Sequence, residues 1–212
     1  MNNSSNNKKK IISKEKKFLS FLLKNSIIFG ILATGFSSIG IFLPNAHSLD
    51  NPLDSASVEH ILGHIAWGLF VGIVSFNLRY FFLTGIFASI LDFDHFVHFL
   101  GIDATVRMAH SIPFGILSAT VLTFLCRKKN YWLAVVSFAS IFSHISFDIL
   151  YKNEGPFPLF TPFYNEYFYF RNIDWILFEF LAIAIIGIMM IQTKQYRFLK
   201  RVKNYSEFDN ED

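Results

Sequence analysis

The chain has 212 residues, of which 52% are hydrophobic and 18% aromatic, and its mean hydropathy is +0.39. Its apolar residues come in blocks of about 18–22, the length that spans a bilayer, which argues against an ordinary soluble domain. The single Cys126 excludes an internal disulfide and a cysteine-rich zinc site. The net charge of +3 is small, so the placement of the charges is more informative than their sum.

Residues 1–19 are polar, Asn-rich and basic, which predicts a disordered cytoplasmic tail. No aromatic residues alternate with its lysines, so we expect no nucleic-acid partner. The first membrane span is expected at 20–43 and ends at Pro44. A cleaved signal peptide is the alternative, since Ala46-His47-Ser48 resembles a cleavage site. The apolar stretch is long for a signal peptide, and we favour a retained anchor.

Five more spans are expected, at about 58–78, 80–100, 110–126, 131–151 and 173–192. Residues 152–172 form a long outer loop rich in proline and aromatic residues, and 194–212 form a charged cytoplasmic tail. The predicted fold is one all-α, polytopic transmembrane helical bundle of about six spans, with its membrane domain at 20–193.

Lysine and arginine are distributed unevenly between the two sides of this predicted bundle. All but three of the 19 lie in the two tails, in the first turn of the first span, or in the turns after the second and fourth spans; the exceptions are Arg107, Lys152 and Arg171. Positively charged loops stay in the cytoplasm. The sequence therefore predicts a multi-pass protein of the cell membrane with both termini cytoplasmic.

Several polar residues interrupt the predicted spans. A charge at the centre of a span costs about 2.5–3.5 kcal/mol on insertion scales, so such residues are candidates for function. They fall at the starts of spans two, four and six and near the ends of spans three and five, all in the outer half: His60, His64, Asp92, Asp94, His95, His98, His110, His144, Asp148 and Glu179. Independent core histidines have no reason to share one depth.

The spacing of these residues suits a metal site. His144 and Asp148 are four residues apart, as are His60 and His64, which places each pair on one helical face. Imidazole and carboxylate together are typical ligands of Zn²⁺, Mn²⁺ or Fe²⁺. We predict one or more divalent ions, with zinc as the first expectation. The predicted metal ligands are His64, Asp92, Asp94, His95, His110, His144 and Asp148.

Other polar residues have simpler interpretations. His60 and His98 are expected mainly as interfacial groups or as partners of the ligands, and Asp92 could also orient a ligand histidine. His47 is expected to be a loop residue. Asp174 suits a helix start.

Three segments, in order, resemble motifs of the YdjM-like membrane-bound metal-dependent hydrolases. Leu91-Asp-Phe-Asp-His95 resembles their PDxDH element, and His110-Ser111 resembles the end of HRGxTHS. Ser143-His-Ile-Ser-Phe-Asp148 with Gly155–Pro162 resembles SHxxxD…GxxxLxP. The resemblance covers about 58–163. Leu91 replaces a proline, the middle element lacks its first histidine and its threonine, and Arg107 is displaced by one position.

The resemblance implies a metal-dependent hydrolase, distantly similar to zinc-dependent phospholipases C and P1-type nucleases. We expect cleavage of a phosphoester in a lipid or lipid-linked substrate, with Asp94 bridging two metals. The expected catalytic residues are Glu154, Glu166 or Glu179 as acid or base, and Arg107, or alternatively Arg171, as a phosphate contact. The expected partners are membrane lipids and this substrate; the oligomeric state stays open. A metal transporter or sensor, and a structural metal site, are the alternatives.

Overall fold

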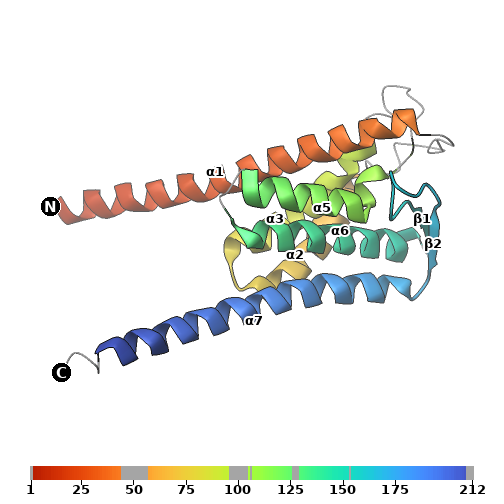
Figure 1. Ribbon diagram of the computed structural model, residues 1–212. Coiled ribbons are helices and arrows are strands. Elements are labelled where there is room, and N and C mark those ends of the chain that lie inside the picture. The colour runs from red at the N-terminus through yellow and green to blue at the C-terminus, as the bar shows by residue number, and fades with distance from the viewer. Residues whose placement is uncertain are drawn as a thin grey trace.

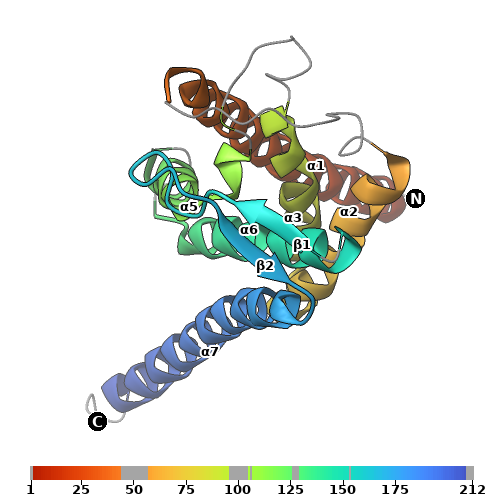
Figure 2. The ribbon, with the colours of Figure 1, turned by 90° about the vertical axis from the view of Figure 1, so that its right-hand side faces the viewer.

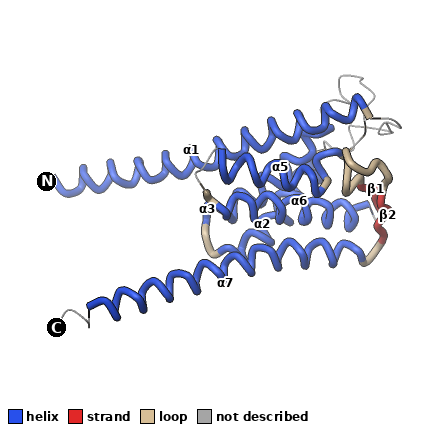
Figure 3. The backbone as a smooth tube through the Cα atoms, in the orientation of Figure 1, coloured by secondary structure: helices blue, strands red, loops and turns tan. Residues whose placement is uncertain are grey.

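The structure is a computed structural model that describes residues 2–43, 57–95, 105, 107–125, 129–152 and 154–208. Within these ranges, the side chains of 2–10, 94, 125, 154–155 and 195–208 lie outside the description. The described chain is a helical bundle with one short hairpin at one end (Figures 1 and 3). This confirms the predicted all-α bundle.

The helices and strands are named here in chain order. Their bounds are α1 (Asn2–Ser38), η1 (Ile39–Phe42), α2 (Val58–Gly72), η3 (Ile73–Ser75), α3 (Leu78–Ile90), η4 (Leu91–His95), η5 (Met108–His110), α5 (Ile112–Thr120), η6 (Val121–Leu125), α6 (Tyr131–Lys152), β1 (Glu154–Phe157), β2 (Phe168–Arg171) and α7 (Asp174–Phe208). The η elements are short 3-10 helices, except η6, which is a π-helical turn.

Four helical segments are long and apolar enough to cross a membrane: Ile11–Phe42, Val58–Ser75, Tyr131–Lys152 and Asp174–Lys194. The third and fourth predicted spans are shorter in the structure, because α3 has 13 residues and α5 has nine. The third span was expected to continue to residue 100. Its α-helix instead ends at Ile90, where the polar run that begins at Asp92 turns inward as a 3-10 helix.

Polar side chains mark where the short helices begin. Ser57 accepts a hydrogen bond from the His60 amide, Asn77 from the Arg79 amide, and Ser111 from the Phe114 amide. These caps satisfy amide groups that have no partner inside the helix. The Ser57 cap fixes the start of α2, which carries His60. The Ser111 cap fixes the start of α5, directly after His110.

Helices α2 and α3 approach each other closely through glycine residues. A Cβ atom added at Gly68 would lie 2.7 Å from the Thr84 carbonyl oxygen, and one added at Gly72 would lie 2.7 Å from that of Phe81. Small residues at such positions let two membrane helices pack backbone to backbone. This packing holds the His60 end of α2 beside the Asp92 end of α3.

Aromatic side chains fill the layer between α1, α3 and α5. The Phe29 and Phe87 rings stack with centroids 4.1 Å apart, and the Phe114 ring meets Phe29 edge to face at 5.4 Å. All three are fully buried. Several of the chain's many phenylalanines therefore serve the core.

The N-terminal tail and the outer loop differ from the sequence prediction. Residues 2–19, expected as a disordered tail, continue α1, and the charged segment from residue 194 continues α7 as far as Phe208. Good helix formers such as lysine and leucine occur in both segments without glycine or proline. The 152–172 segment contains an antiparallel hairpin in which β1 pairs with β2, with Phe157 opposite Phe168. Aromatic residues favour such strands. Both α1 and α7 extend beyond the bundle at one end, and the hairpin lies at the other (Figures 1 and 2).

Candidate metal centre

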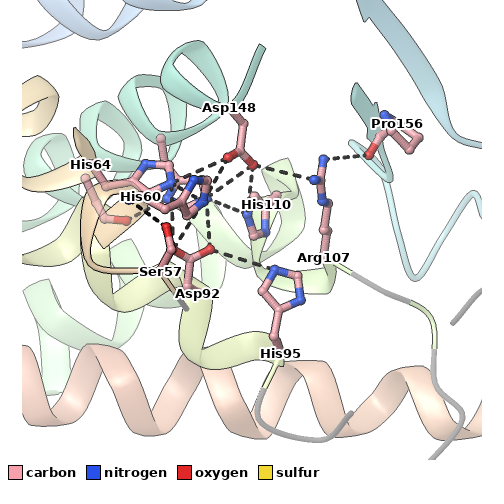
Figure 4. Close-up of polar contacts among 11 residues, drawn as sticks. Ser57, His60, His64, Asp92, His95, Arg107, His110, Asp148 and Pro156 are labelled. Atoms are coloured by element: carbon pink, nitrogen blue, oxygen red, sulfur yellow. Dashed lines mark hydrogen bonds and ion pairs between the residues drawn. The ribbon is translucent and has the colours of Figure 1, made fainter. Parts of the chain in front are cut away.

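Five histidines and two aspartates meet near the hairpin end of the bundle (Figure 4). Helix α2 supplies His60 and His64, η4 supplies Asp92 and His95, η5 supplies His110, and α6 supplies His144 and Asp148. The five imidazoles are buried or nearly so, and the Asp92 side chain is 10% exposed. Four separate chain segments thus bring donor atoms to one place.

The imidazoles approach one another through their Nε2 atoms. His110 Nε2 lies 2.7 Å from His144 Nε2, and His60 Nε2 lies 3.0 Å from His64 Nε2. The His64 and His144 rings stack with centroids 3.7 Å apart. Imidazole is an ordinary metal ligand through this nitrogen, so the rings present their ligating atoms toward a shared centre.

Asp148 joins two groups of histidines. Its Oδ1 atom lies 3.3 Å from His60 Nε2 and 3.4 Å from His64 Nε2. Its Oδ2 atom lies 3.6 Å from His144 Nε2 and 4.0 Å from His110 Nε2. A carboxylate placed in this way could bind one ion with each oxygen.

Asp92 makes a similar set of contacts from the η4 side. Its Oδ2 atom lies 3.7 Å from His64 Nε2, while its Oδ1 atom lies 3.5 Å from His144 Nε2 and 3.7 Å from His95 Nε2. His64 and His144 therefore each contact both carboxylates. The two aspartates hold the cluster together from neighbouring helices.

The backbone of α3 orients His144. The Nδ1 atom of His144 lies 2.6 Å from the Ala88 carbonyl oxygen. A carbonyl oxygen can only accept, so Nδ1 carries the proton and, in the neutral ring, Nε2 keeps its lone pair toward the cluster. Metal-ligating histidines commonly have such a partner on their other ring nitrogen.

Arg107 brings the one guanidinium that contacts the described cluster. Its Nη2 atom lies 3.9 Å from Asp148 Oδ2, and its Nη1 donates to the Pro156 carbonyl oxygen at 3.3 Å. The guanidinium also lies over the Phe157 ring at 4.9 Å. Arg107 has a left-handed backbone (φ 58°), an uncommon conformation for a residue with a side chain. It connects the cluster to β1.

The donor set fits divalent cations. The ligand atoms form four overlapping groups of three, each within 4.8 Å: His60, His64 and Asp148; His64, Asp92 and His144; Asp92, His95 and His110; and His110, His144 and Asp148. The first and third groups share no residue, so the cluster has donors for two ions. With neutral imidazoles, two carboxylates against one guanidinium leave net negative charge, which a buried dication would offset.

The structure brings together every predicted metal ligand whose side chain is described: His64, Asp92, His95, His110, His144 and Asp148. The Asp94 side chain and His98 lie outside the described residues, so the bridging role predicted for Asp94 stays a prediction. His60, expected mainly as an interfacial group or ligand partner, is a full member of the cluster. The signal was its four-residue spacing from His64.

The glutamates predicted as acid or base have no described contact with the His/Asp cluster. Glu179 is buried on α7 beside Ser146 and Trp67, and no described contact joins it to the His/Asp cluster. Ser146 lies between His144 and Asp148 in sequence, so it faces the opposite side of α6. Glu166 is exposed in the hairpin loop, and the Glu154 side chain lies outside the described residues.

Asp174 lies at a helix start, as expected, whereas Arg171, the alternative phosphate contact, has no described contact with the cluster. The Asp174 carboxylate accepts a hydrogen bond from the Arg171 amide at 2.9 Å, at the beginning of α7. Arg171 is exposed. The helix-start interpretation of Asp174 is therefore confirmed.

Among known proteins, the chain matches a family model. No curated protein and no solved structure matches the chain, so the distant similarity to zinc-dependent phospholipases C stays a prediction. The YdjM inner membrane protein family matches residues 56–202, more than half of the chain and all of the described metal-centre residues. The three motifs that resemble this family in sequence contribute Asp92, His95, His110 and the His144–Asp148 pair to the centre. The chain belongs to the YdjM inner membrane protein family.

Proposed function

We propose that this protein is a membrane-bound, metal-dependent hydrolase that cleaves a phosphoester of a lipid or lipid-linked substrate. One observation carries the proposal: seven buried or nearly buried donor side chains converge from four chain segments. Buried ionisable groups in a membrane protein are costly, so they are retained for function.

Two disjoint ligand groups would hold the ions. His60, His64 and Asp148 form one, and Asp92, His95 and His110 form the other, with His144 in contact with both aspartates. Bound Zn²⁺, Mn²⁺ or Fe²⁺ at such a centre acidifies a water molecule and offsets negative charge on a phosphoryl oxygen. Zinc is our first candidate because it favours imidazole with carboxylate ligands.

Arg107 is proposed to bind the substrate phosphate. Its guanidinium is held by Asp148, the Pro156 carbonyl and the Phe157 ring, so its position is fixed before substrate arrives. Its Nε atom has no hydrogen-bond partner among the described residues. A guanidinium with a remaining donor can bind a phosphate oxygen by a charge-assisted hydrogen bond.

We propose Glu154 as the first of the three glutamate candidates for acid or base. Its backbone lies in β1, two residues before Pro156, whose carbonyl oxygen accepts a hydrogen bond from Arg107. Glu166 lies in the exposed loop of the same hairpin, and Glu179 lies on the far side of α6. Both are weaker candidates.

The membrane setting supports a lipid substrate. The centre lies near the hairpin end, and the basic ends of α1 and α7 lie at the opposite end (Figure 1). With the basic ends in the cytoplasm, the centre lies near the extracytoplasmic face. Phosphates of lipid headgroups lie at this level of a bilayer.

The test uses the full chain purified in detergent or nanodiscs. Metal content is measured first, and then phosphate release from phosphatidic acid and from undecaprenyl phosphates. We expect turnover that is lost in Asp92→Ala and His144→Ala but retained in a matched Ser146→Ala variant. Bound metal without turnover of any phosphoester would contradict the proposal. Zn²⁺ uptake into liposomes that depends on His144 would instead favour a transporter.

A further inference from the structure

A second feature lies on the membrane-facing side of α1, next to the metal centre. A groove of about 560 Å³ runs between α1 and the end of α3 with η4. One face of α1 between Leu23 and Gly35 lines one side of the groove, and Ile90 and Phe93 line the other. Its lining is mainly apolar, and no charged residue contributes to it.

The rim of the groove faces the bilayer. Leu23, Ile27 and Ile31 are 58%, 51% and 66% exposed on a helical segment long and apolar enough to span a membrane. Such residues face lipid rather than water in a membrane protein. An occupant of this groove must therefore be apolar.

Two glycines form the floor of the groove, and they differ in what surrounds them. A Cβ atom at Gly30 would lie 3.3 Å from Ile90 Cγ2, so Gly30 serves helix packing. A Cβ atom at Gly35 would have nothing within 4 Å. The space above Gly35 is thus open among the described residues.

One end of the groove reaches the metal centre. Residues three apart in a 3-10 helix lie on the same side, so Asp92 and His95 both face the cluster. Phe93, between them, faces α1, where its carbonyl accepts a hydrogen bond from the Thr34 hydroxyl at 3.4 Å. A molecule in the groove would thus contact Phe93, the neighbour of Asp92 in sequence.

The length and the volume of the groove fit a narrow apolar molecule. From Leu23 to Gly35, α1 rises about 18 Å at ~1.5 Å per residue, slightly more than half of the ~30 Å hydrocarbon core. A volume of about 560 Å³ over this length leaves a cross-section of roughly 30 Å². A single hydrocarbon chain fits.

We infer that this groove binds a hydrocarbon chain of the lipid substrate while its phosphate group lies at the metal centre. The inference rests on the proposed function, because it assigns the substrate of that site. It makes the protein selective for long-chain lipid phosphates over short ones with the same headgroup. The hydrocarbon chain of the lipid contacts α1, and its phosphate headgroup contacts Arg107 and the metal centre.

Gly35→Leu tests the inference. The new side chain enters empty space, and leucine favours a helix more than glycine, so the fold is retained. Gly187→Leu on α7 is the matched control, since a Cβ there would meet only Val74 Cγ1 at 3.9 Å. We expect hydrolysis of dioleoyl phosphatidic acid to fall about tenfold in Gly35→Leu, with hydrolysis of p-nitrophenyl phosphate unchanged. Gly187→Leu should leave both unchanged.

A second measurement does not depend on hydrolysis. Phosphatidic acid with a photoactivatable acyl chain is crosslinked to the full chain in nanodiscs, and adducts are mapped by mass spectrometry. We expect adducts enriched over residues 23–35 and lost in Gly35→Leu. If this holds while no phosphoester is cleaved, the groove binds lipid and the proposed function fails. If phosphatidic acid is cleaved but Gly35→Leu leaves chain-length preference and crosslinking unchanged, the groove inference is overturned. A change in oligomeric mass with unchanged crosslinking would also overturn it, in favour of a second copy of the chain.

Discussion

The two faces of α6 carry buried polar groups of different kinds. On one face, His144 and Asp148 contact donors from α2, η4 and η5. On the other, the Ser146 hydroxyl donates to the Trp175 carbonyl and accepts from the Trp67 indole, with Glu179 beside them. The first face has many ligand atoms and few proton donors. The second has one carboxyl, beside a hydroxyl and an indole whose protons are donated to other atoms.

This difference separates a metal site from a structural polar contact. On the second face, the Trp67 indole, the Ser146 hydroxyl and the Trp175 carbonyl satisfy one another by hydrogen bonds, and only the Glu179 carboxyl beside them has no geometric hydrogen bond among the described residues. The first face gathers nitrogen lone pairs and carboxylates, which repel unless protons or cations lie between them. The four predictions below test this distinction, from the largest effect to the smallest.

His144→Ala should remove the metal, whereas Ser146→Ala should not. Loss of a residue that only supports a ligand costs about 10–100-fold in affinity, so loss of a direct ligand should cost more than about 100-fold. Metal content of the purified variants by mass spectrometry measures this. Equal metal content in both variants would show that the His144 face is not the metal-binding face.

Chelation should destabilise the wild-type protein but not His144→Ala. A ligand present at 100 times its dissociation constant stabilises the native state by about 2.7 kcal/mol, and chelation removes this contribution. Thermal unfolding in detergent with and without a chelator reports the change. A wild-type melting temperature that does not respond would show that no stabilising ion is bound.

Arg107→Gln should reduce phosphoester turnover while metal is retained. Hydrogen bonds to charged groups are worth about 1.5–3 kcal/mol, so kcat/KM should fall roughly 10–100-fold. Metal content and kinetics are measured on the same preparation. A parallel loss of metal would instead make Arg107 a support for Asp148 alone.

Glu179→Gln should have the smallest effect. Glutamine keeps the shape of the side chain, and the carboxyl oxygens that it replaces make no geometric hydrogen bond among the described residues, so stability should change by about 1 kcal/mol or less. Metal content and turnover should be unchanged. A loss of turnover with metal still bound would restore Glu179 as an acid or base and join the two faces into one site.

Sequence alone predicted much of the centre because its signals are local or chemical. The four-residue spacing of His144 and Asp148 survives in α6, and membrane burial makes each polar residue conspicuous. The role of His60 was underestimated, since its convergence depends on the close packing of α2 on α3 through Gly68 and Gly72. That contact is tertiary and has no local signature.

Secondary structure was harder to predict where hydrophobicity was the main guide. Apolar length predicted a full span at 80–100, but it does not show that the helix changes type at Leu91. Likewise, the aromatic content of 152–172 suggested a loop at the interface and gave no register for the β1–β2 pairing. The position of Arg107 beside Phe157 depends on that pairing.

The short 3-10 helix η4 makes ion binding sensitive to helix type. Asp92 and His95 face the same way there, whereas in a regular α-helix they would diverge by about 60°. Residues three apart stay neighbours in both helix types, so a change of η4 to α-helix would alter the angle at which His95 meets Asp92 and His110 rather than separate them. The helix type of five residues thus sets the shape of one ligand triad, without any movement of the long helices.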